Sequence, residues 1–239
     1  VTVPLAPAHP WAERIVAFPD LKSAAAFGQT FTEADGIAKK LVSVFDPAIP
    51  QKLGRVGKLV PEGRAAAIVM VSEPQADAMA AMARDFGGTV VFERGAAEAQ
   101  AAAFEGTGSY GPLYEYTWNH TTLHALKRDP AITYLQVKFP EQNSLEVLTC
   151  LAETFGEEVL MHLEFQRRFG KVAFSALPLV SYTTDERLAE IITTINATGA
   201  LVSDPHSYVL NNAGWKRIDA PQPEFKRLAD PHGLMNPGK

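Results

Sequence analysis

Hydrophobic and polar positions along this chain follow two periods, and together they predict one succession of elements that occurs twice. Short runs rich in Val, Ile, Leu and Phe between turn residues predict strands, and apolar residues at every third or fourth position predict amphipathic helices. In the first half the predicted strands are 14–18, 40–45, 65–71 and 89–92. One helix separates the first two strands and another separates the last two, which gives the order βαββαβ.

The helices of the first half carry start signals. Asp20 is placed to cap an Ala-rich helix that continues to residue 31. Ser72 or Glu73, with Pro74 in the first turn, begins the second helix. The residues of the second helix that we expect to face inward are Ala78, Met79, Met82 and Phe86. The span 48–63 is rich in Gly, Pro and Lys and predicts a long loop.

The second half repeats the same order. Its predicted strands are 132–137, 159–165, 172–177 and 201–203. Asn143 or Ser144 is expected to cap the first helix of this half, and Thr184 the second. The apolar residues predicted to be buried on the two helices are Leu145, Leu148, Phe155, Leu188, Ile191, Ile192 and Ile195.

Two consecutive βαββαβ units predict an α+β fold of two tandem ferredoxin-like units. The first unit is expected over 13–96, a connector over 97–129 and the second unit over 130–208, so that the main domain is 13–208. Such units form antiparallel sheets with helices on one face. We expect one large antiparallel sheet whose other face is either exposed to solvent or closed by another domain.

Composition excludes several classes of function. The 239 residues carry a net charge of −5 and contain no block of Lys and Arg, which argues against binding to nucleic acid or to an anionic membrane surface. No apolar run is long enough to span a bilayer and no leader is recognised, so we expect a cytoplasmic protein. Cys150, the one cysteine, cannot form an internal disulfide and lies in an apolar pattern, which predicts a buried, inert thiol.

The connector contains the stretch richest in functional side chains, residues 113–124. Read as a helix, it places Tyr116, His120 and His124 on one face. Read as an extended chain, it places Tyr114, Tyr116, Trp118 and His120 on one side. In both interpretations aromatic rings and imidazoles line one wall, which is the composition of a small-molecule pocket. A half-buried helix with satisfied histidines is the structural alternative.

The two ends of the chain resemble a known family. The closing residues 230–239, Asp-Pro-His-Gly-Leu-Met-Asn-Pro-Gly-Lys, and the opening Val-Thr-Val-Pro-Leu-Ala-Pro look like those of FAD-linked oxidases of the vanillyl-alcohol-oxidase and p-cresol-methylhydroxylase type. The cap domain of that family is built from two ferredoxin-like units. The resemblance therefore implies that 1–12 is the remnant of a preceding FAD-domain strand, that 209–239 is the C-terminal tail, and that Asn236 contacts the cofactor.

The resemblance also implies a missing part. The FAD domain of this family precedes its cap, and its diphosphate-binding loops are not found here. The one Gly-rich loop, 106–111, matches neither a dinucleotide fingerprint nor a P-loop and is better interpreted as a flexible joint. Since the first residue is Val rather than Met, we expect a fragment cut from a longer protein. Its partner would be its own FAD domain, and alone it would be inactive, without bound FAD.

Several residues are candidates for the chemistry. Oxidising a hydroxyl carbon by hydride transfer requires removal of a proton from oxygen, and histidine suits that task at neutral pH. The candidate bases are His120, His124 and His206. The candidate substrate-binding residues are Tyr114, Tyr116, Trp118, His162, Glu164, Arg167 and Tyr208. His162 and Glu164 alternate along one strand, and Arg167 could clamp a carboxylate or lie in a solvated turn.

A metal site is a competing interpretation. His120 and His124 have the i, i+4 spacing of ligands on a helix, and Glu164 could supply an oxygen. The hydroxy-acid dehydrogenases of the wider family carry a His-rich motif in the cap, whereas the comparable strand here, from His162 to Arg167, has one histidine. This departure weakens the case for both a metal and a lactate-like substrate.

Two hypotheses follow. The first is the substrate-binding cap domain of an FAD-dependent oxidoreductase that oxidises a hydroxy acid or a related alcohol. The second is a stand-alone tandem ferredoxin-like protein that binds a small ligand or mediates dimerisation, since a fold does not determine a function. Homo-oligomerisation is compatible with either.

Overall fold

The structure is a computed structural model that describes residues 8–168, 170–203 and 221–235. The opening motif 1–7, the last four residues of the closing motif (236–239), and the site candidates His206, Tyr208 and Asn236 lie outside the described residues.

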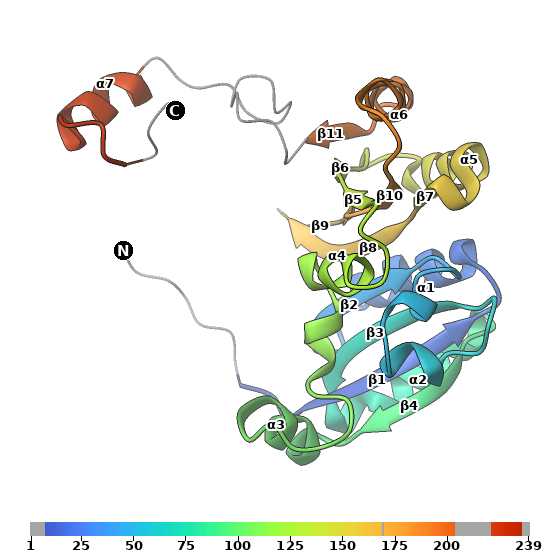
Figure 1. Ribbon diagram of the computed structural model, residues 1–239. Coiled ribbons are helices and arrows are strands. Elements are labelled where there is room, and N and C mark those ends of the chain that lie inside the picture. Colours follow the sequence, from blue (N-terminus) through green and yellow to red (C-terminus); the bar gives the residue numbers. More distant parts are fainter. Residues whose placement is uncertain (1–7, 169, 204–220, 236–239) are drawn as a thin grey trace.

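One antiparallel sheet of eight strands runs through the body of the molecule (Figure 1). In sheet order its strands are β11 (Leu201–Ser203), β6 (Gln136–Lys138), β9 (Lys171–Ala176), β8 (His162–Arg168), β2 (Lys39–Phe45), β3 (Ala65–Ser72), β1 (Trp11–Phe18) and β4 (Thr89–Arg94). Within each half the strands lie in the order fourth, first, third, second, which is the ferredoxin-like order. The prediction of two tandem units in one large sheet is therefore confirmed.

The two units are joined edge to edge by their second strands. In the pairing of β2 with β8, Ser43 lies opposite Glu164 and Phe45 opposite His162. Side chains alternate along a strand, so these four residues share one face of the sheet, while Val44 and Leu163 point to the other. The junction between the units thus brings polar side chains together that are more than a hundred residues apart in sequence.

Two of the predicted strands are interrupted. The span 132–137 divides into β5 (Ile132–Tyr134) and β6, and the span 159–165 divides into β7 (Val159–Leu160) and β8. The first part of each pairs with β10 (Leu179–Ser181) in a separate three-stranded sheet. The small sheet contributes to both apolar clusters: Ile132, Leu160 and Leu179 belong to the cluster on the second face, and Val159 and Val180 to the helix-side core.

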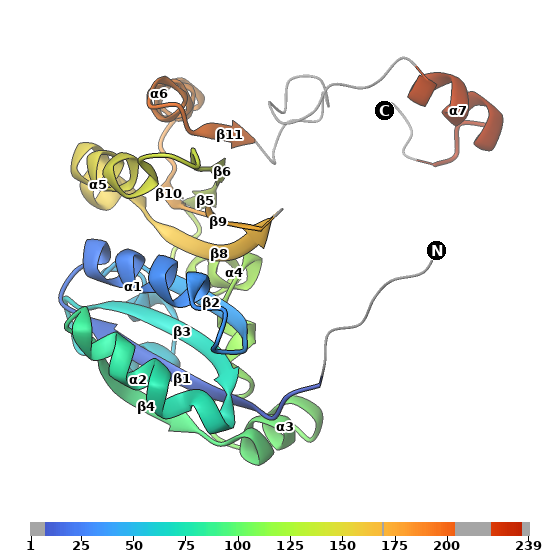
Figure 2. The ribbon, with the colours of Figure 1, turned by 180° about the vertical axis from the view of Figure 1, so that it is seen from behind.

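Four helices cover one face of the large sheet, as Figures 1 and 2 show from opposite sides. They are α1 (Leu21–Glu33), α2 (Ala76–Asp85), α5 (Ser144–Phe155) and α6 (Asp185–Ala197). Asp20 and Thr184 cap α1 and α6 as predicted, since their side chains accept hydrogen bonds from the backbone N–H groups of Ser23 and Arg187. Asn143 begins α5 from a left-handed conformation with φ of 52°, without a side-chain cap.

Burial on these helices departs from prediction in two places. On α2 the prediction that Ala78 faces inward is wrong: Ala78 is exposed, and Ala76 and Ala83 are buried beside Met79. A preceding 3₁₀ turn, η3 (Glu73–Gln75), shifts the phase of the helix relative to a start at Pro74. On α5 Cys150 is exposed, which corrects the prediction of a buried thiol, because Val147, Leu148 and Leu151 form the inward stripe.

The second face of the sheet is covered largely by the chain itself. The predicted loop 48–63 contains the short helices η1 (Pro50–Lys52) and η2 (Val56–Leu59), and the connector contributes η4 (Leu113–Tyr116) and α4 (Asn119–Leu126). Together with the small sheet they enclose a second apolar cluster around Phe45. The expectation that this face is open or closed only by another domain therefore needs correction, because two intervening segments fold back over it.

A buried ion pair ties the connector to the sheet. Glu13 is 1% exposed; its Oε1 accepts the N–H of Leu113 at 2.9 Å, and its Oε2 lies 3.1 Å from Nη1 of Arg94. Burial raises the pKa of Glu13, although the Leu113 N–H and the Arg94 guanidinium both oppose the rise. Because this carboxylate anchors the start of η4, it sets where the aromatic stretch begins.

The remaining helices are α3 (Ala96–Phe104), η5 (Gly156–Glu158) and α7 (Pro221–Ala229). After α7, the carboxylate of Asp230 accepts the N–H groups of Leu234 and Met235, which makes a compact turn and lowers the pKa of Asp230. Over the described ranges, no helix has the length and apolar character that crossing a membrane requires.

Candidate functional site

A hollow of about 350 Å³ opens on the face of the sheet opposite the four helices. Its floor comes from β2 and β3 and its wall from the connector. The residues that line it are Lys40, Leu41, Met70, Tyr114, Thr117, Trp118 and His120. The volume lies at the lower end of the range for small-molecule sites, and an apolar lining with a few polar groups is typical of them.

The aromatic wall depends on a break in the connector at Trp118. Tyr114 belongs to η4, His120 belongs to α4, and Trp118 between them has φ of 52° and ψ of −140°. This stretch is therefore neither the continuous helix nor the extended chain considered from sequence. The break brings Tyr114, Trp118 and His120 to the hollow and leaves Tyr116 and His124 beside it.

A buried carboxylate holds the break in place. Oε1 of Glu164 accepts the backbone N–H of Trp118 at 2.7 Å and the hydroxyl of Ser43 at 2.8 Å, and it lies 2.8 Å from Nε2 of His162. All three polar side chains are at most 1% exposed. Positive φ is costly for a bulky residue such as Trp, so the surrounding structure must stabilise it. The bond to Glu164 is one such interaction.

The contacts of His162 favour one tautomer. Nδ1 has no hydrogen-bond partner among the described residues, whereas Nε2 faces Glu164. An N–H at Nδ1 would be a buried donor without an acceptor, which is costly. His162 is therefore best described with its proton on Nε2, donated to Glu164, and with its ring stacked on Phe45 at 4.8 Å between centroids. His162 and Glu164 point to the same face of the sheet and contact each other, and neither lines the hollow, into which both were expected to point.

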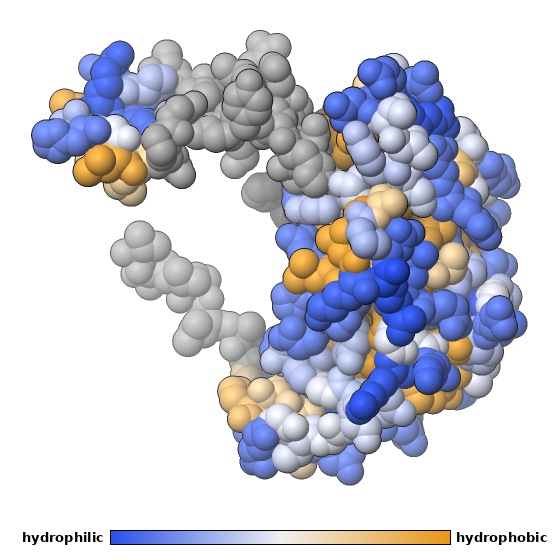
Figure 3. Space-filling model, viewed as in Figure 1, coloured by the Kyte–Doolittle hydropathy of each residue, from blue (hydrophilic) through white to orange (hydrophobic). Residues whose placement is uncertain are grey.

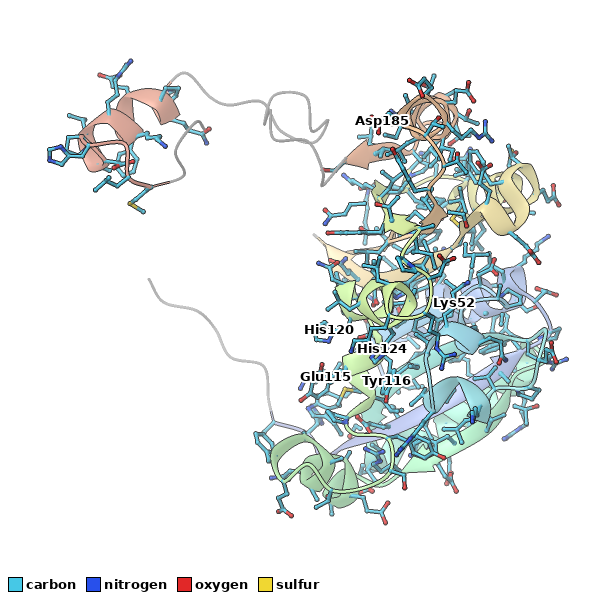
Figure 4. All side chains as sticks on the ribbon, viewed as in Figure 1. Lys52, Glu115, Tyr116, His120, His124 and Asp185 are labelled. Carbon is cyan, nitrogen blue, oxygen red and sulfur yellow. The ribbon has the colours of Figure 1, made fainter. Side chains whose placement is uncertain are left out.

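A second cluster lies at the rim, in the connector (Figure 4). Nδ1 of His120 is 2.8 Å from the carboxylate of Glu115. His124 stacks on Tyr116 at 4.6 Å between centroids, and its Nε2 lies 3.1 Å from the Glu115 carbonyl oxygen. Burial lowers the pKa of His124, which favours the neutral imidazole. The hydroxyl of Tyr116 donates to the carbonyl of Tyr110 at 2.8 Å, and burial raises the pKa of the Tyr116 hydroxyl.

The geometry does not assemble the three metal candidates. His120 and His124 take different atoms of Glu115 as partners, and Glu164 is engaged beneath the hollow by three donors. Within the described part of the chain, no group of three or more His, Cys, Asp or Glu side chains could hold a metal ion. The spacing of His120 and His124 alone does not produce a metal site here.

Arg167 lies apart from the hollow. Its guanidinium is 2.6 Å from the carboxylate of Asp35 and donates to the backbone carbonyls of Gly170 and, more weakly, of Thr32 and Glu33 at the end of α1. Along β8, Arg167 points to the same face of the sheet as Leu163 and Phe165, which is the face covered by the helices. The structure thus places Arg167 as a tie between a hairpin and a helix end, away from the other predicted substrate-binding residues.

Several residues of the site were missed in the sequence: Lys40, Leu41, Met70 and Thr117 in the lining, and Ser43 and Glu115 beside it. Ser43 is completely buried in the middle of an apolar strand, and Lys40 precedes that strand's regular part. Only Ser43 carried a signal, because a hydroxyl among Leu41, Val42, Val44 and Phe45 needs a polar partner. The partner, Glu164, is set by the β2–β8 register, which no local pattern specifies.

The glycines of the loop 106–111 do not line a closely packed cradle. Gly106, Gly108 and Gly111 all have positive φ, but a Cβ built on any of them would meet open space. Their conformation requires glycine, yet no neighbouring group comes close enough to make a cradle. The loop joins α3 to η4.

No family model matches the sequence, and no curated protein matches it. Two solved structures of alkyldihydroxyacetonephosphate synthase resemble the fold. The first has a TM-score of 0.56 and 11% identity, covering 96% of this chain and 44% of that chain. The second has a TM-score of 0.51 and 10% identity, covering 95% of this chain and 44% of that chain. At this identity the likeness concerns the fold alone, and the chain spans less than half the length of the proteins it resembles.

Proposed function

We propose that this chain is the substrate-binding cap domain of an FAD-dependent oxidoreductase that acts on a hydroxy acid or a related alcohol. The observation that carries the proposal is architectural: nearly the whole chain corresponds in fold to less than half of an enzyme, alkyldihydroxyacetonephosphate synthase. The end motifs that resemble FAD-linked oxidases support the same assignment. In such an enzyme the flavin performs the redox chemistry.

The hollow supplies binding and orientation in this proposal. Tyr114 and Trp118 offer aromatic surface for the apolar part of the substrate. His120 is the candidate base, because Glu115 accepts from Nδ1, and Nε2, which has no partner among the described residues, can accept a proton from a substrate hydroxyl. His124 contributes indirectly, since it holds the Glu115 backbone.

The partner we propose is an FAD domain of the same protein. Exposed apolar side chains support this, because a contiguous apolar area tends to mark an interface. Leu123 and Leu126 of α4 are 54% and 36% exposed, close in sequence to Trp118, which is 44% exposed. Figure 3 shows apolar surface over α4 amid a mostly hydrophilic face. Without the neighbouring domain the chain is proposed to be inactive.

The test is to purify the protein from its complete reading frame and compare it with the 239-residue chain. We expect the visible absorption of oxidised flavin in the complete protein and none in the chain alone. Under anaerobic conditions a 2-hydroxy acid that is a substrate should bleach the flavin bands, and His120→Ala should slow bleaching by about 10²-fold or more, the usual contribution of a general base. A complete protein that purifies without flavin would contradict the proposal.

One observation favours the second candidate, a stand-alone small-ligand-binding protein. The chain covers much of the second sheet face with its own η1, η2, η4 and α4, and it has a separate apolar cluster there. A domain that depends on a neighbour to close its core would not need this cover. A complete reading frame that encodes no further domain, together with ligand binding by the chain alone, would support this candidate.

A further inference from the structure

The edge of β2 carries a β-bulge beside the hollow. Lys39 pairs with Val71 and Leu41 with Met70, so Lys40 is an extra residue without a partner on β3. In a regular strand Lys40 and Leu41 would point to opposite faces, yet both line the hollow. Bulges redirect a side chain in this way and are frequent beside functional sites.

The bulge separates two neighbouring lysines. Lys39 points to the helix side, where its Nζ contacts the carbonyl of Ala34 and lies 4.9 Å from the centre of the Phe31 ring. Lys40 borders the hollow and also an adjacent surface depression near Arg167. Within the described part of the chain, Lys40 makes no ion pair or hydrogen bond through its side chain, so its charge is available to a ligand.

Lys40 is the ammonium group in the lining of the hollow, which favours an anionic ligand over a cationic one. The carboxylate of Glu115 lies at the rim, 2.8 Å from Nδ1 of His120, and its side chain is 50% exposed, so that solvent screens its charge. The floor and wall are apolar at Leu41, Met70 and Trp118. An ammonium group acts as a point charge with up to three donors, and a single one matches a monoanion better than a dianion.

We propose that Lys40 is the anion anchor of the hollow and binds the carboxylate of a small organic acid whose apolar part lies against Trp118 and Tyr114. The inference rests on the proposed function only for the class of ligand, an organic acid. It assigns a specificity-determining role to a residue for which the sequence carried no signal. The β-bulge gives Lys40 this role because it turns the Lys40 side chain toward the hollow.

The test uses the 239-residue chain and three probes that differ in charge: mandelate, its neutral methyl ester, and phenyl phosphate. Binding is followed by NMR through the indole N–H signal of Trp118, assigned with Trp118→Phe. We expect mandelate to bind about fivefold or more tightly than the ester, as a partly exposed charge-assisted contact provides. Phenyl phosphate should bind no more tightly than mandelate.

Variants assign the effect to one residue. Lys40→Met should bring the affinity for mandelate down to that for the ester, and Lys40→Arg should retain most of the difference. Lys58→Met is the matched control, because it removes the same charge from an exposed position on η2 outside the hollow. Since Lys40 is exposed, its replacement should leave the amide spectrum of the fold unchanged.

Four results would overturn the proposal: equal affinity for the acid and the ester, unchanged mandelate binding in Lys40→Met, tighter binding of phenyl phosphate, or no response of Trp118 to mandelate. None of these bears on whether the complete protein holds a flavin. Conversely, a complete protein without flavin contradicts the proposed function and leaves the binding result intact. The two proposals therefore fail separately.

Discussion

At the scale of the residue, Glu164 connects the two halves of the molecule to the connector. It lies on β8 of the second unit, bonds Ser43 on β2 of the first, and accepts the backbone N–H of Trp118 from the connector. A buried carboxylate is stable only where it is hydrogen-bonded, and here three donors converge on one oxygen. Its alternation with His162 was visible in the sequence, but its partners were not.

Replacing Glu164 by Ala should destabilise the fold strongly. The substitution leaves the Ser43 hydroxyl and the partly buried Trp118 N–H without their acceptor, and leaves the His162 Nε2 proton with only the Ser43 Oγ, 3.0 Å away, as a partner. We expect a loss of about 3 kcal/mol in the free energy of unfolding. Urea denaturation measures it. Glu62→Ala, in an exposed turn, is the control and should change stability by less than about 0.5 kcal/mol. Equal effects of the two variants would contradict the role assigned to Glu164.

At the scale of the element, local signals specify helix starts better than strand ends. Asp20 and Thr184 cap α1 and α6 because an Asp or Thr side chain can reach the free N–H groups of the first turn without help from the rest of the fold. The division of 132–137 into β5 and β6 has no such local cause. It depends on which sheet each part joins.

The cap of α1 can be tested directly. Asp20→Ala removes the bond of 2.7 Å to the Ser23 N–H, and we expect a loss of about 1 kcal/mol in the free energy of unfolding. Asp20→Asn keeps an oxygen acceptor and should retain most of the stability. Thermal and urea unfolding of the three proteins supply the comparison. If both substitutions cost the same, the charge rather than the hydrogen bond would be responsible.

At the scale of the whole molecule, the two ferredoxin-like units share one sheet and one helix-side core. The apolar cluster beneath the four helices contains Phe31 and Val44 of the first unit and Leu148 and Phe165 of the second. A shared core couples the units energetically. Pairing of β2 with β8 also removes two sheet edges that would otherwise be open to another chain.

We therefore expect the body to unfold in a single cooperative transition. Tryptophan fluorescence reports on Trp11 in β1 and Trp118 in the connector, once Trp215, which lies outside the described residues, is replaced by Phe in the parent protein. Far-UV circular dichroism reports on both units. Coincident urea transitions by the two signals would show that the units unfold together. Two separated transitions would contradict it and would mean that the β2–β8 junction is weak.

The sequence by itself determined the order of the elements, their duplication, the fold class and most of the buried helix faces, because period and capping are local properties of the chain. It also marked the connector as the stretch richest in aromatic and imidazole side chains, although neither the helical nor the extended interpretation gave the set Tyr114, Trp118 and His120 that lines the hollow. Tertiary structure alone decided the β2–β8 register, the bulge at Lys40 and the folding of the connector over the second face. Each of these depends on pairing between segments far apart in sequence, and such pairing is governed by packing that no single segment encodes.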